Sequence, residues 1–347
     1  MTLEDVARRA RVSTATVSRV LNKFDGVRPA TRARVLRAVE ELNYTPNLNA
    51  RSLSGAEPRT IGMVVSNIGN PFFLDIFRHV EAGARERGFD VLVANTDYEP
   101  ARLASSIATI VGRRVAGLAL VVSETVPPLV APLAGRLPVV LYDGGGHRLK
   151  NVTNIRADYH GGMQRLVEYL HELGHRRMAF LGHHTRLGPL HERKQAFLEV
   201  AEEYAPRVKV MTVASGDGMA GGQLAMRQVL DSGFRPTAVA CVNDLMAVGA
   251  LRELHARGVP VPGEVSVTGF DNIAPAEFAS PPLTTADVPR ETIARLICDA
   301  LLAGGGGGGG GGAARSAPRE IVVETRLVVR ESTARPPSAL PRRARGR

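Results

Sequence analysis

The sequence predicts two architectures in one chain: a small all-α unit at the N-terminus, followed by an α/β core with parallel sheets. Two observations predict it. Residues 1–46 hold three short stretches whose apolar residues recur at helical spacing. From residue 60 onward, runs rich in valine, isoleucine and leucine alternate with amphipathic helical stretches. The 347 residues are enough for several domains, and the core is long enough for two lobes.

Composition narrows the class of protein. Hydrophobic residues make up 44% of the chain and charged residues 22%, as in ordinary globular proteins. No apolar run approaches the roughly 18 residues of a membrane span, and the opening "MTLEDVARRA" holds no apolar signal-peptide core. We therefore expect a cytoplasmic protein with no membrane partner. Cys241 and Cys298 lie in apolar surroundings, which indicates two buried thiols and not a disulfide framework.

The net charge of +10 is concentrated at the two ends. Residues 1–55 hold 10 Lys and Arg against 5 Asp and Glu, residues 330–347 hold 6 against 1, and the middle is neutral. A basic N-terminal unit indicates a polyanionic partner. The end of the chain, 336–347, is expected to be a disordered basic tail.

The N-terminal helices follow from their apolar spacing. Ser13 is a good N-cap for the second helix, and only about three residues separate it from the first, so the two must cross steeply. Such an arrangement is a helix-turn-helix, whose second helix enters the major groove of DNA. The inward-facing positions are Leu3, Val6, Ala7 and Ala10 in the first helix, Val17, Val20 and Leu21 in the second, and Val35, Val39 and Leu42 in the third.

The polar face of the second helix supplies candidate DNA contacts: Thr14, Ala15, Thr16, Ser18 and Arg19. An Arg19 guanidinium can bind a guanine edge through two hydrogen bonds, and the Ala15 methyl can meet a thymine methyl. Ser13, Thr16 and Asn22 are expected to anchor phosphates. The alternative is a small helical bundle with a solvated polar face.

These residues resemble the DNA-binding headpiece of the lactose-repressor/galactose-repressor family. The resemblance rests on "TLEDVARRARVSTATVSRVLN", "TRARVLRAVEELNYTPN" and "ARSL", which run in order over about 55 residues. One departure is Arg28 before Pro29, where relatives usually carry a serine. Because Arg28 cannot accept an amide hydrogen bond as a cap, we expect about 1 kcal/mol less local stability.

The resemblance also suggests a role for "NLNARSLSG", residues 47–55. It implies that residues 47–59 are a hinge helix and linker that folds only on operator DNA, beside the dimer mate. Leu53 would wedge into a central base step of the minor groove, which bends the duplex. Tyr44, Asn47 and Ala50 are implied as further DNA contacts. The alternative is a plain linker with an incidental leucine.

The core resembles the two-lobed, periplasmic-binding-protein-like (type I) fold of the same family. The matching stretches are "NPFF", "CVNDLMAVGALRELHARG", "PGEVSVTGFDN", "PPLTTADVPRE" and "LVVREST". The resemblance implies a core over 60–335 that crosses between lobes near residues 157, 286 and 320. The expected segments are about 60–157 and 287–319 in the N-lobe, and about 158–286 and 320–335 in the C-lobe.

Ligands of such α/β sheets lie at the carboxyl ends of strands. The resemblance places these effector-contacting positions there: Ser66, Phe72, Phe73, Asp143, Arg193, Asn243 and Asp271. Polar groups beside aromatic walls suit a polyhydroxylated ring or a base. As an alternative, Asn243 and Asp271 cap the helices after their strands. A departure is Gly218, where relatives often carry an aromatic residue.

Two features invite an enzymatic interpretation. "HELGH" at 171–175 matches the HExxH zinc motif, but Gly174 and a following strand place His175 at or beyond the helix end. The glycine run 304–312 lacks the flanking strand and helix of a phosphate loop and is expected to be flexible. We therefore expect no metal, cofactor or catalytic residues.

The sequence thus predicts a dimeric, ligand-responsive transcription repressor associated with the nucleoid. Its partners would be a pseudo-palindromic operator and a small-molecule effector, expected to be a carbohydrate. The alternatives are a periplasmic-type sugar-binding protein without a DNA role, and an enzyme.

Overall fold

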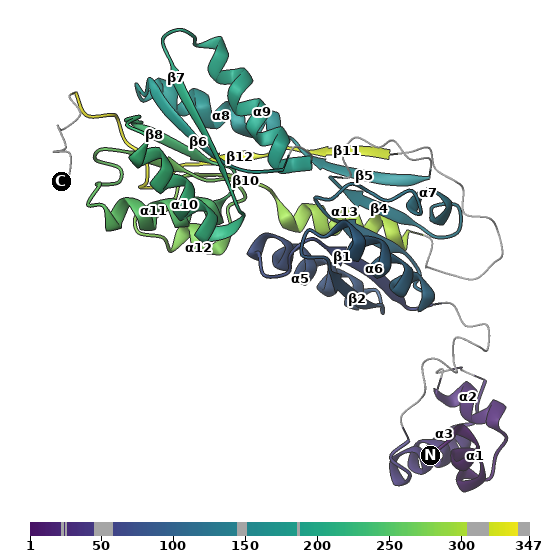
Figure 1. The fold of residues 1–347 in the computed structure, drawn as a ribbon. Helices are drawn as coiled ribbons and strands as arrows, with labels where there is room; N and C mark the ends of the chain where they lie inside the picture. The colour runs from purple at the N-terminus through teal and green to yellow at the C-terminus, as the bar shows by residue number, and fades with distance from the viewer. Residues whose placement is uncertain are drawn as a thin grey trace. The chain divides into compact units, whose positions relative to one another are not determined.

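A computed structural model describes residues 1–21, 24, 26–44, 58–143, 151–185, 188–303 and 319–338. The chain divides into two compact units, Met1–Pro58 and Arg59–Arg347, whose elements are labelled in Figure 1. The expected hinge contacts Asn47, Ala50 and Leu53, the phosphate anchor Asn22, the glycine run 304–312 and residues 339–347 lie outside the described residues.

The N-terminal unit is built from three helices around one small core. They are α1 (Leu3–Ala10), α2 (Thr14–Leu21) and α3 (Pro29–Glu41). Val6, Val17 and Val35, one from each helix, are fully buried against one another. The apolar spacing in the sequence therefore correctly predicted which face of each helix packs inward.

Capping residues set where these helices begin. Thr2 and Asp5 form a reciprocal capping box at the start of α1. At the start of α2, Thr16 N donates to Ser13 Oγ at 3.3 Å, as predicted. Arg28 precedes α3 without a side-chain cap and Pro29 begins the helix, which confirms the expected missing cap.

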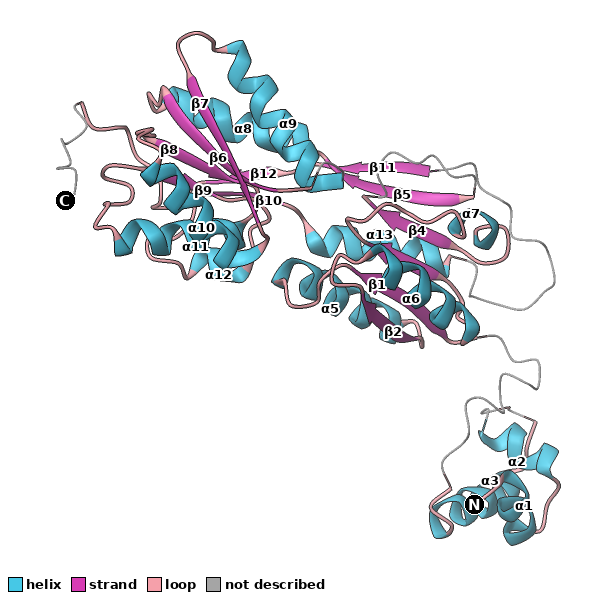
Figure 2. Cartoon of the chain, viewed as in Figure 1, coloured by secondary structure: helices cyan, strands magenta, loops and turns pink. Residues whose placement is uncertain are grey.

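The N-lobe of the core is a six-stranded parallel sheet in the order β11-β5-β4-β3-β1-β2. Figure 2 shows helices on both faces of this sheet, which explains why its central strands are apolar without alternation. Its strands are β1 (Thr60–Val65), β2 (Asp90–Asn95), β3 (Leu118–Val121), β4 (Val139–Tyr142), β5 (Val152–Ala157) and β11 (Arg319–Val323). Its helices are α5 (Pro71–Glu86), α6 (Pro100–Gly112), α7 (Val130–Leu133) and α13 (Arg290–Leu302).

The C-lobe holds a four-stranded parallel sheet in the order β7-β6-β8-β9, with a small antiparallel pair, β10-β12. The strands are β6 (Arg177–His183), β7 (Lys209–Ser215), β8 (Ala238–Cys241), β9 (Ser266–Thr268), β10 (Thr285–Asp287) and β12 (Arg326–Val328). The helices are α8 (Tyr159–Glu172), α9 (Gly188–Glu203), α10 (Gly218–Asp231), α11 (Asp244–Ala256) and α12 (Ala274–Glu277).

Two of the three crossings between lobes lie later than the sequence predicted. The boundary at 286 falls inside β10, which pairs with β12 in the C-lobe. The boundary at 320 is wrong, because β11 pairs with β5 as far as Val323. "EIVVETRLVVR" is therefore two strands in two sheets, divided at Glu324 and Thr325.

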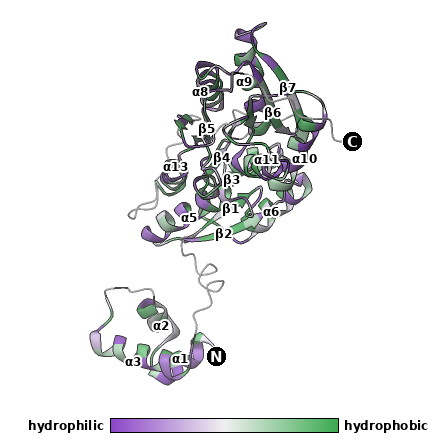
Figure 3. Cartoon of the chain, turned by 90° about the vertical axis from the view of Figure 1, so that its left-hand side faces the viewer, coloured by the Kyte–Doolittle hydropathy of each residue, from purple (hydrophilic) through white to green (hydrophobic). Residues whose placement is uncertain are grey.

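The core is packed in the way that its sequence implies. The helices carry both hydrophobic and hydrophilic residues (Figure 3), and their apolar faces contact the sheets. Cys241 and Cys298 are buried free thiols, as predicted. None of the helices in the described part of the chain combines the length and the hydrophobicity needed to cross a bilayer.

Candidate functional sites: a DNA-binding face and an interlobe cleft

The predicted DNA-contacting residues of α2 lie on its outer face. Ser13, Thr14, Ala15 and Arg19 are exposed, and Thr16 and Ser18 are half-buried. Val17 and Val20, between them in the sequence, are buried in the core of the unit. The fold therefore presents the polar side chains together on one side of a short helix.

Tyr44 occupies a different environment from these residues. It is half-buried and packs against the small core of the N-terminal unit, and its amide donates to Val39 O at 3.0 Å. Sequence reasoning overlooked a basic group beside α1, where Arg8, Arg9 and Arg11 line a shallow groove with Asp5. Charge counts alone did not show that these residues share one surface.

The core carries a cavity between its lobes, at the carboxyl ends of the strands. Six of the seven predicted effector residues line it: Phe72, Phe73, Asp143, Arg193, Asn243 and Asp271. Sequence reasoning missed eight further lining residues: Asn70, Tyr98, Val122, Ser123, Tyr142, Tyr159, Pro189 and Leu190. The remaining void is about 30 Å³, room for one or two water molecules. A ring-sized ligand therefore requires the lining groups to move apart.

Ser66, the seventh predicted residue, does not line this cavity. Its side chain is fully buried at the end of β1, where it donates to the Glu124 carboxylate and accepts from Ser123 N at 2.8 Å. Thr96 at the end of β2 donates to the same carboxylate. Ser66 therefore fixes the loop that carries Ser123, and Ser123 is the residue that lines the cavity.

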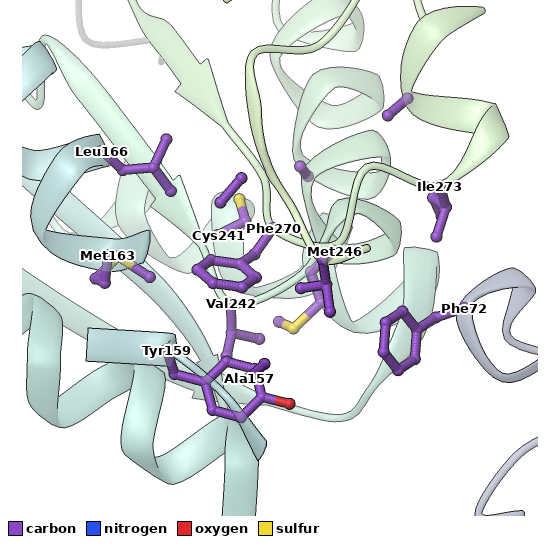
Figure 4. Packing of buried hydrophobic residues seen from close by; sticks show 14 of the residues in the cluster. Phe72, Ala157, Tyr159, Met163, Leu166, Cys241, Val242, Met246, Phe270 and Ile273 are labelled. Carbon is purple, nitrogen blue, oxygen red and sulfur yellow. The ribbon is translucent and has the colours of Figure 1, made fainter. Parts of the chain in front are cut away.

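Arg193 is the central cation of the cleft. Its Nη2 lies 2.8 Å from Asp271 Oδ1, and its Nη1 donates to Val242 O at 2.9 Å. The guanidinium carbon lies 4.6 Å from the ring centre of Tyr159 and 4.2 Å from that of Phe270. Both rings appear in Figure 4, packed among the buried apolar residues of the C-lobe.

The charge of Arg193 is stabilised by these neighbours. Burial disfavours the charged form, yet Asp271 and the nearby tyrosines raise the pKa of Arg193 above its ordinary value. Its Nε is buried and has no hydrogen-bond partner in the described part of the chain. A buried donor without a partner is costly, so this N–H is a ready site for a ligand oxygen.

Asp143 faces the cavity from the end of β4 in the N-lobe. Its Oδ1 accepts from Ala157 N at 3.3 Å, and its Oδ2 accepts from the Tyr159 hydroxyl. Burial raises the pKa of Asp143 to about 7, although these hydrogen bonds and Arg193 oppose the rise. This carboxyl can therefore accept or donate a hydrogen bond to a ligand hydroxyl near neutral pH.

Asn243 and Asp271 differ in the capping role that the sequence left open. Asn243 caps α11, because its Oδ1 accepts from Met246 N at 2.9 Å, and it also lines the cavity. Asp271 caps no helix. Ile273 is the N-cap residue of α12, and the Asp271 carboxylate pairs with Arg193.

The two histidines of "HELGH" do not share a helix face. His171 is in α8 and stacks on Tyr204, whereas α8 ends at Glu172. The His175 ring nitrogens contact Thr237 Oγ1 at 3.0 Å and Ala334 O at 2.9 Å. Burial lowers the pKa of His175 to about 4, so it is a neutral structural residue that joins the end of α8 to the C-terminal segment.

Comparison with known protein families gives two matches. Residues 2–47 match the bacterial regulatory proteins of the lacI family, and residues 167–333 match the periplasmic binding protein-like domain. The helix-turn-helix unit and the two-lobed core thus correspond to separate known domains.

Individual relatives cover nearly the whole chain. The HTH-type transcriptional repressor PurR of Proteus mirabilis is 35% identical over 96% of this chain and 97% of its own length. The ribose operon repressor of Escherichia coli is 35% identical over 87% of this chain and 92% of its own. Among solved structures, the Lac repressor dimer bound to operator and the anti-inducer ONPF aligns with a TM-score of 0.80 and 25% identity, over 96% of this chain and 99% of that one.

A helix-turn-helix unit followed by a two-lobed core with an interlobe cleft defines a class, the DNA-binding transcription regulators that respond to small molecules. The extent of the matches identifies the family within that class. The chain belongs to the lacI family of bacterial regulatory proteins.

Proposed function

We propose that this regulator is a repressor whose effector is a small, uncharged, polyhydroxylated ligand, a sugar or sugar derivative, bound between the lobes. The observation that carries the proposal is the ion pair of Arg193 and Asp271 beside Asp143 and Asn243, between aromatic rings. Hydroxyl groups are recognised by such alternating donors and acceptors, and the apolar face of a sugar ring packs on flat aromatic walls.

The charges of the cleft favour a neutral ligand over a phosphorylated one. Among the described residues that line it, Arg193 is the single cation, and Asp271 already pairs with it. Asp143 adds a second carboxyl. A phosphate would meet carboxylates without a spare cation, which costs electrostatic free energy. One solved relative, the transcriptional regulator CelR, 32% identical with a TM-score of 0.69, is described as a cellobiose complex.

We propose that the effector acts by shifting an equilibrium between two arrangements of the lobes. The small void in the present arrangement means that a ligand must bind a more open form or close around it. Only a ligand with different affinities for the two forms changes operator binding. We propose no catalytic step, since the family consists of transcription regulators.

DNA binding is proposed to use a homodimer on a pseudo-palindromic operator. Several large apolar side chains of the core are exposed and would suit a second copy: Leu74, Met219, Leu224 and Phe278.

Arg19 is proposed to read a base, and Ser13 and Thr16 to contact phosphates. Asn22, Tyr44, Asn47, Ala50 and Leu53 stay proposed contacts, and the protein is proposed to act on the nucleoid, in the cytoplasm.

Ligand-dependent melting tests the effector class. Purified full-length protein is heated with D-ribose, cellobiose, D-glucose, ribose 5-phosphate or adenine. A ligand at 100 times its dissociation constant stabilises the fold by about 2.7 kcal/mol. We expect a rise with a neutral sugar, lost in Asp271→Asn and retained in Asp90→Asn, an exposed carboxylate at the start of β2. A rise with ribose 5-phosphate or adenine alone would overturn the proposed ligand class.

A further inference from the structure

A hydrogen bond crosses the cleft at the edge of the N-lobe sheet opposite to two of the three crossings between lobes. Tyr98 follows β2 in the N-lobe, and its hydroxyl donates to Oδ2 of Asp217, which follows β7 in the C-lobe, at 3.0 Å. β2 and β7 are edge strands of their sheets. Two of the crossings leave the N-lobe from β5 and β11, at the opposite edge of its sheet. The contact therefore joins the lobes at an edge where neither of these two crossings holds them together.

The backbone around Tyr98 is held in place for this contact. Asp97 and Tyr98 have φ values of 55° and 61°, in the left-handed region that is unusual for side chains of this size. The Asp97 carboxylate accepts from Asn95 Nδ2 and from Arg102 Nη1, both at 2.6 Å. Tyr98 N donates to Ser66 O at 3.2 Å. The turn is thus fixed on both sides of the residue whose ring enters the cleft.

The Asp217 carboxylate is turned away from its own helix. Asp217 is the N-cap residue of α10, a position where an aspartate usually caps through its side chain, yet it makes no such bond. Its Oδ2 accepts from Tyr98, and its Oδ1 accepts from Asn243 Nδ2 at 3.0 Å. Asn243 lines the cavity. The Asp217 carboxylate therefore connects Tyr98 of the N-lobe to a residue that lines the effector cavity.

The Tyr98 ring also extends the aromatic wall of the N-lobe. It lies edge-on to Phe73, with ring centres 6.5 Å apart, and Phe73 meets Phe72 at 5.4 Å. All three rings line the cavity. On the C-lobe side, Gly218 follows Asp217, and a Cβ atom at Gly218 would meet nothing within 4 Å. The flat wall at this edge of the cleft therefore comes from the N-lobe.

We infer that Tyr98 is a latch residue of the effector cleft: its ring covers the ligand, and its hydroxyl fastens the N-lobe to the C-lobe through Asp217. The latch stabilises the closed arrangement in the absence of ligand and slows ligand escape in its presence. Its significance for regulation rests on the proposed effector function, but the latch itself is a property of the free protein.

Amide hydrogen exchange on the full-length, ligand-free protein tests the latch. Tyr98→Phe keeps the ring and removes the hydroxyl that donates to Asp217 across the cleft. We expect exchange to accelerate in both 95–99 and 215–221, by about tenfold, the factor expected for one hydrogen bond to a charged group. Tyr204→Phe, which alters a tyrosine stacked on His171 outside the cleft lining, should leave both segments unchanged.

The exchange rate of residues 215–221, in the C-lobe, decides the outcome. Acceleration confined to 95–99, or no acceleration, would overturn the latch. In a second arm, the double variant Tyr98→Phe with Asp217→Ala should exchange no faster at 95–99 than Asp217→Ala alone. If exchange at 95–99 is faster in the double variant than in Asp217→Ala alone, the two side chains act separately. That result would also overturn the latch.

This experiment is independent of the proposed function. It needs no ligand and no DNA, so a negative melting screen leaves its result intact. Conversely, loss of the latch would leave sugar binding by Arg193 and Asp271 still open to the melting test.

Discussion

Arg193 and Asp271 form a buried ion pair, 2.8 Å between Nη2 and Oδ1, with side chains 4% and 5% exposed. The pair joins α9 to the loop after β9 within the C-lobe, and both residues face the cleft. It therefore links the stability of the C-lobe to the site that receives the ligand.

Removing one partner of this ion pair should lower the free energy of unfolding. Asp271→Ala leaves a buried guanidinium without its anion, and we expect the free energy of unfolding to fall by about 3–5 kcal/mol. Urea denaturation measures it, with Asp90→Asn as the exposed control, expected within about 0.5 kcal/mol of the wild type. A similar small loss in both variants would show that the pair contributes little.

Asp143 should make stability depend on pH. Burial raises its folded-state pKa to about 7, from an ordinary 3.8. Between these values the unfolded chain loses a proton that the folded one keeps. Stability from this group is therefore complete below about pH 4 and falls as the pH rises toward 7, by up to about 1.4 kcal/mol per unit. Asp143→Asn should flatten the stability profile measured by denaturation between pH 4 and 7, whereas a profile with the wild-type slope would refute the assignment.

Arg19 should determine one base position in each operator half-site. Its exposed side chain on α2 can bind a guanine edge, so Arg19→Ala should relax the preference there by about 1–3 kcal/mol. Selection of binding sites from a random DNA library measures the consensus. An unchanged consensus would show that Arg19 contacts only the backbone.

Leu53 should matter for specific binding only. If its side chain wedges into the minor groove, Leu53→Ala weakens binding to the operator while the charge attraction to non-specific DNA persists. Fluorescence anisotropy with operator and scrambled duplexes at one salt concentration compares the two affinities. Equal losses on both duplexes would argue for a plain linker.

The exposed apolar surface of the C-lobe should serve dimer formation. Phe278 is 84% exposed, more than any other large apolar side chain in the described part of the chain. Phe278→Asp should weaken the dimer, as followed by sedimentation velocity over a range of concentrations. Val322→Asp, at an exposed valine of β11, is the matched control. If the two variants sediment alike, the dimer interface lies elsewhere.

Local pattern was sufficient for the elements themselves. The helical spacing of Val6, Val17 and Val35 predicted the three-helix core, because a short helix can bury only one face. Continuous apolar runs predicted parallel strands, because both faces of such a sheet are covered by helices. Resemblance to known regulators then added six of the residues that line the cleft.

Tertiary structure decided what no local pattern encodes. Whether "EIVVETRLVVR" is one strand or two depends on its partners, β5 in one lobe and β10 in the other. Ser66 lies behind the cleft because a nearby carboxylate, Glu124, binds its hydroxyl.

The same holds for the cleft and its closure. Tyr98 and Asp217 stand 119 positions apart and meet only because the two lobes bring edge strands together. The sequence by itself determined the elements, the polar face of α2 and the family. Packing between lobes decided which side chains share the cleft, since contacts between distant segments depend on the relative placement of whole sheets and not on the residues beside them.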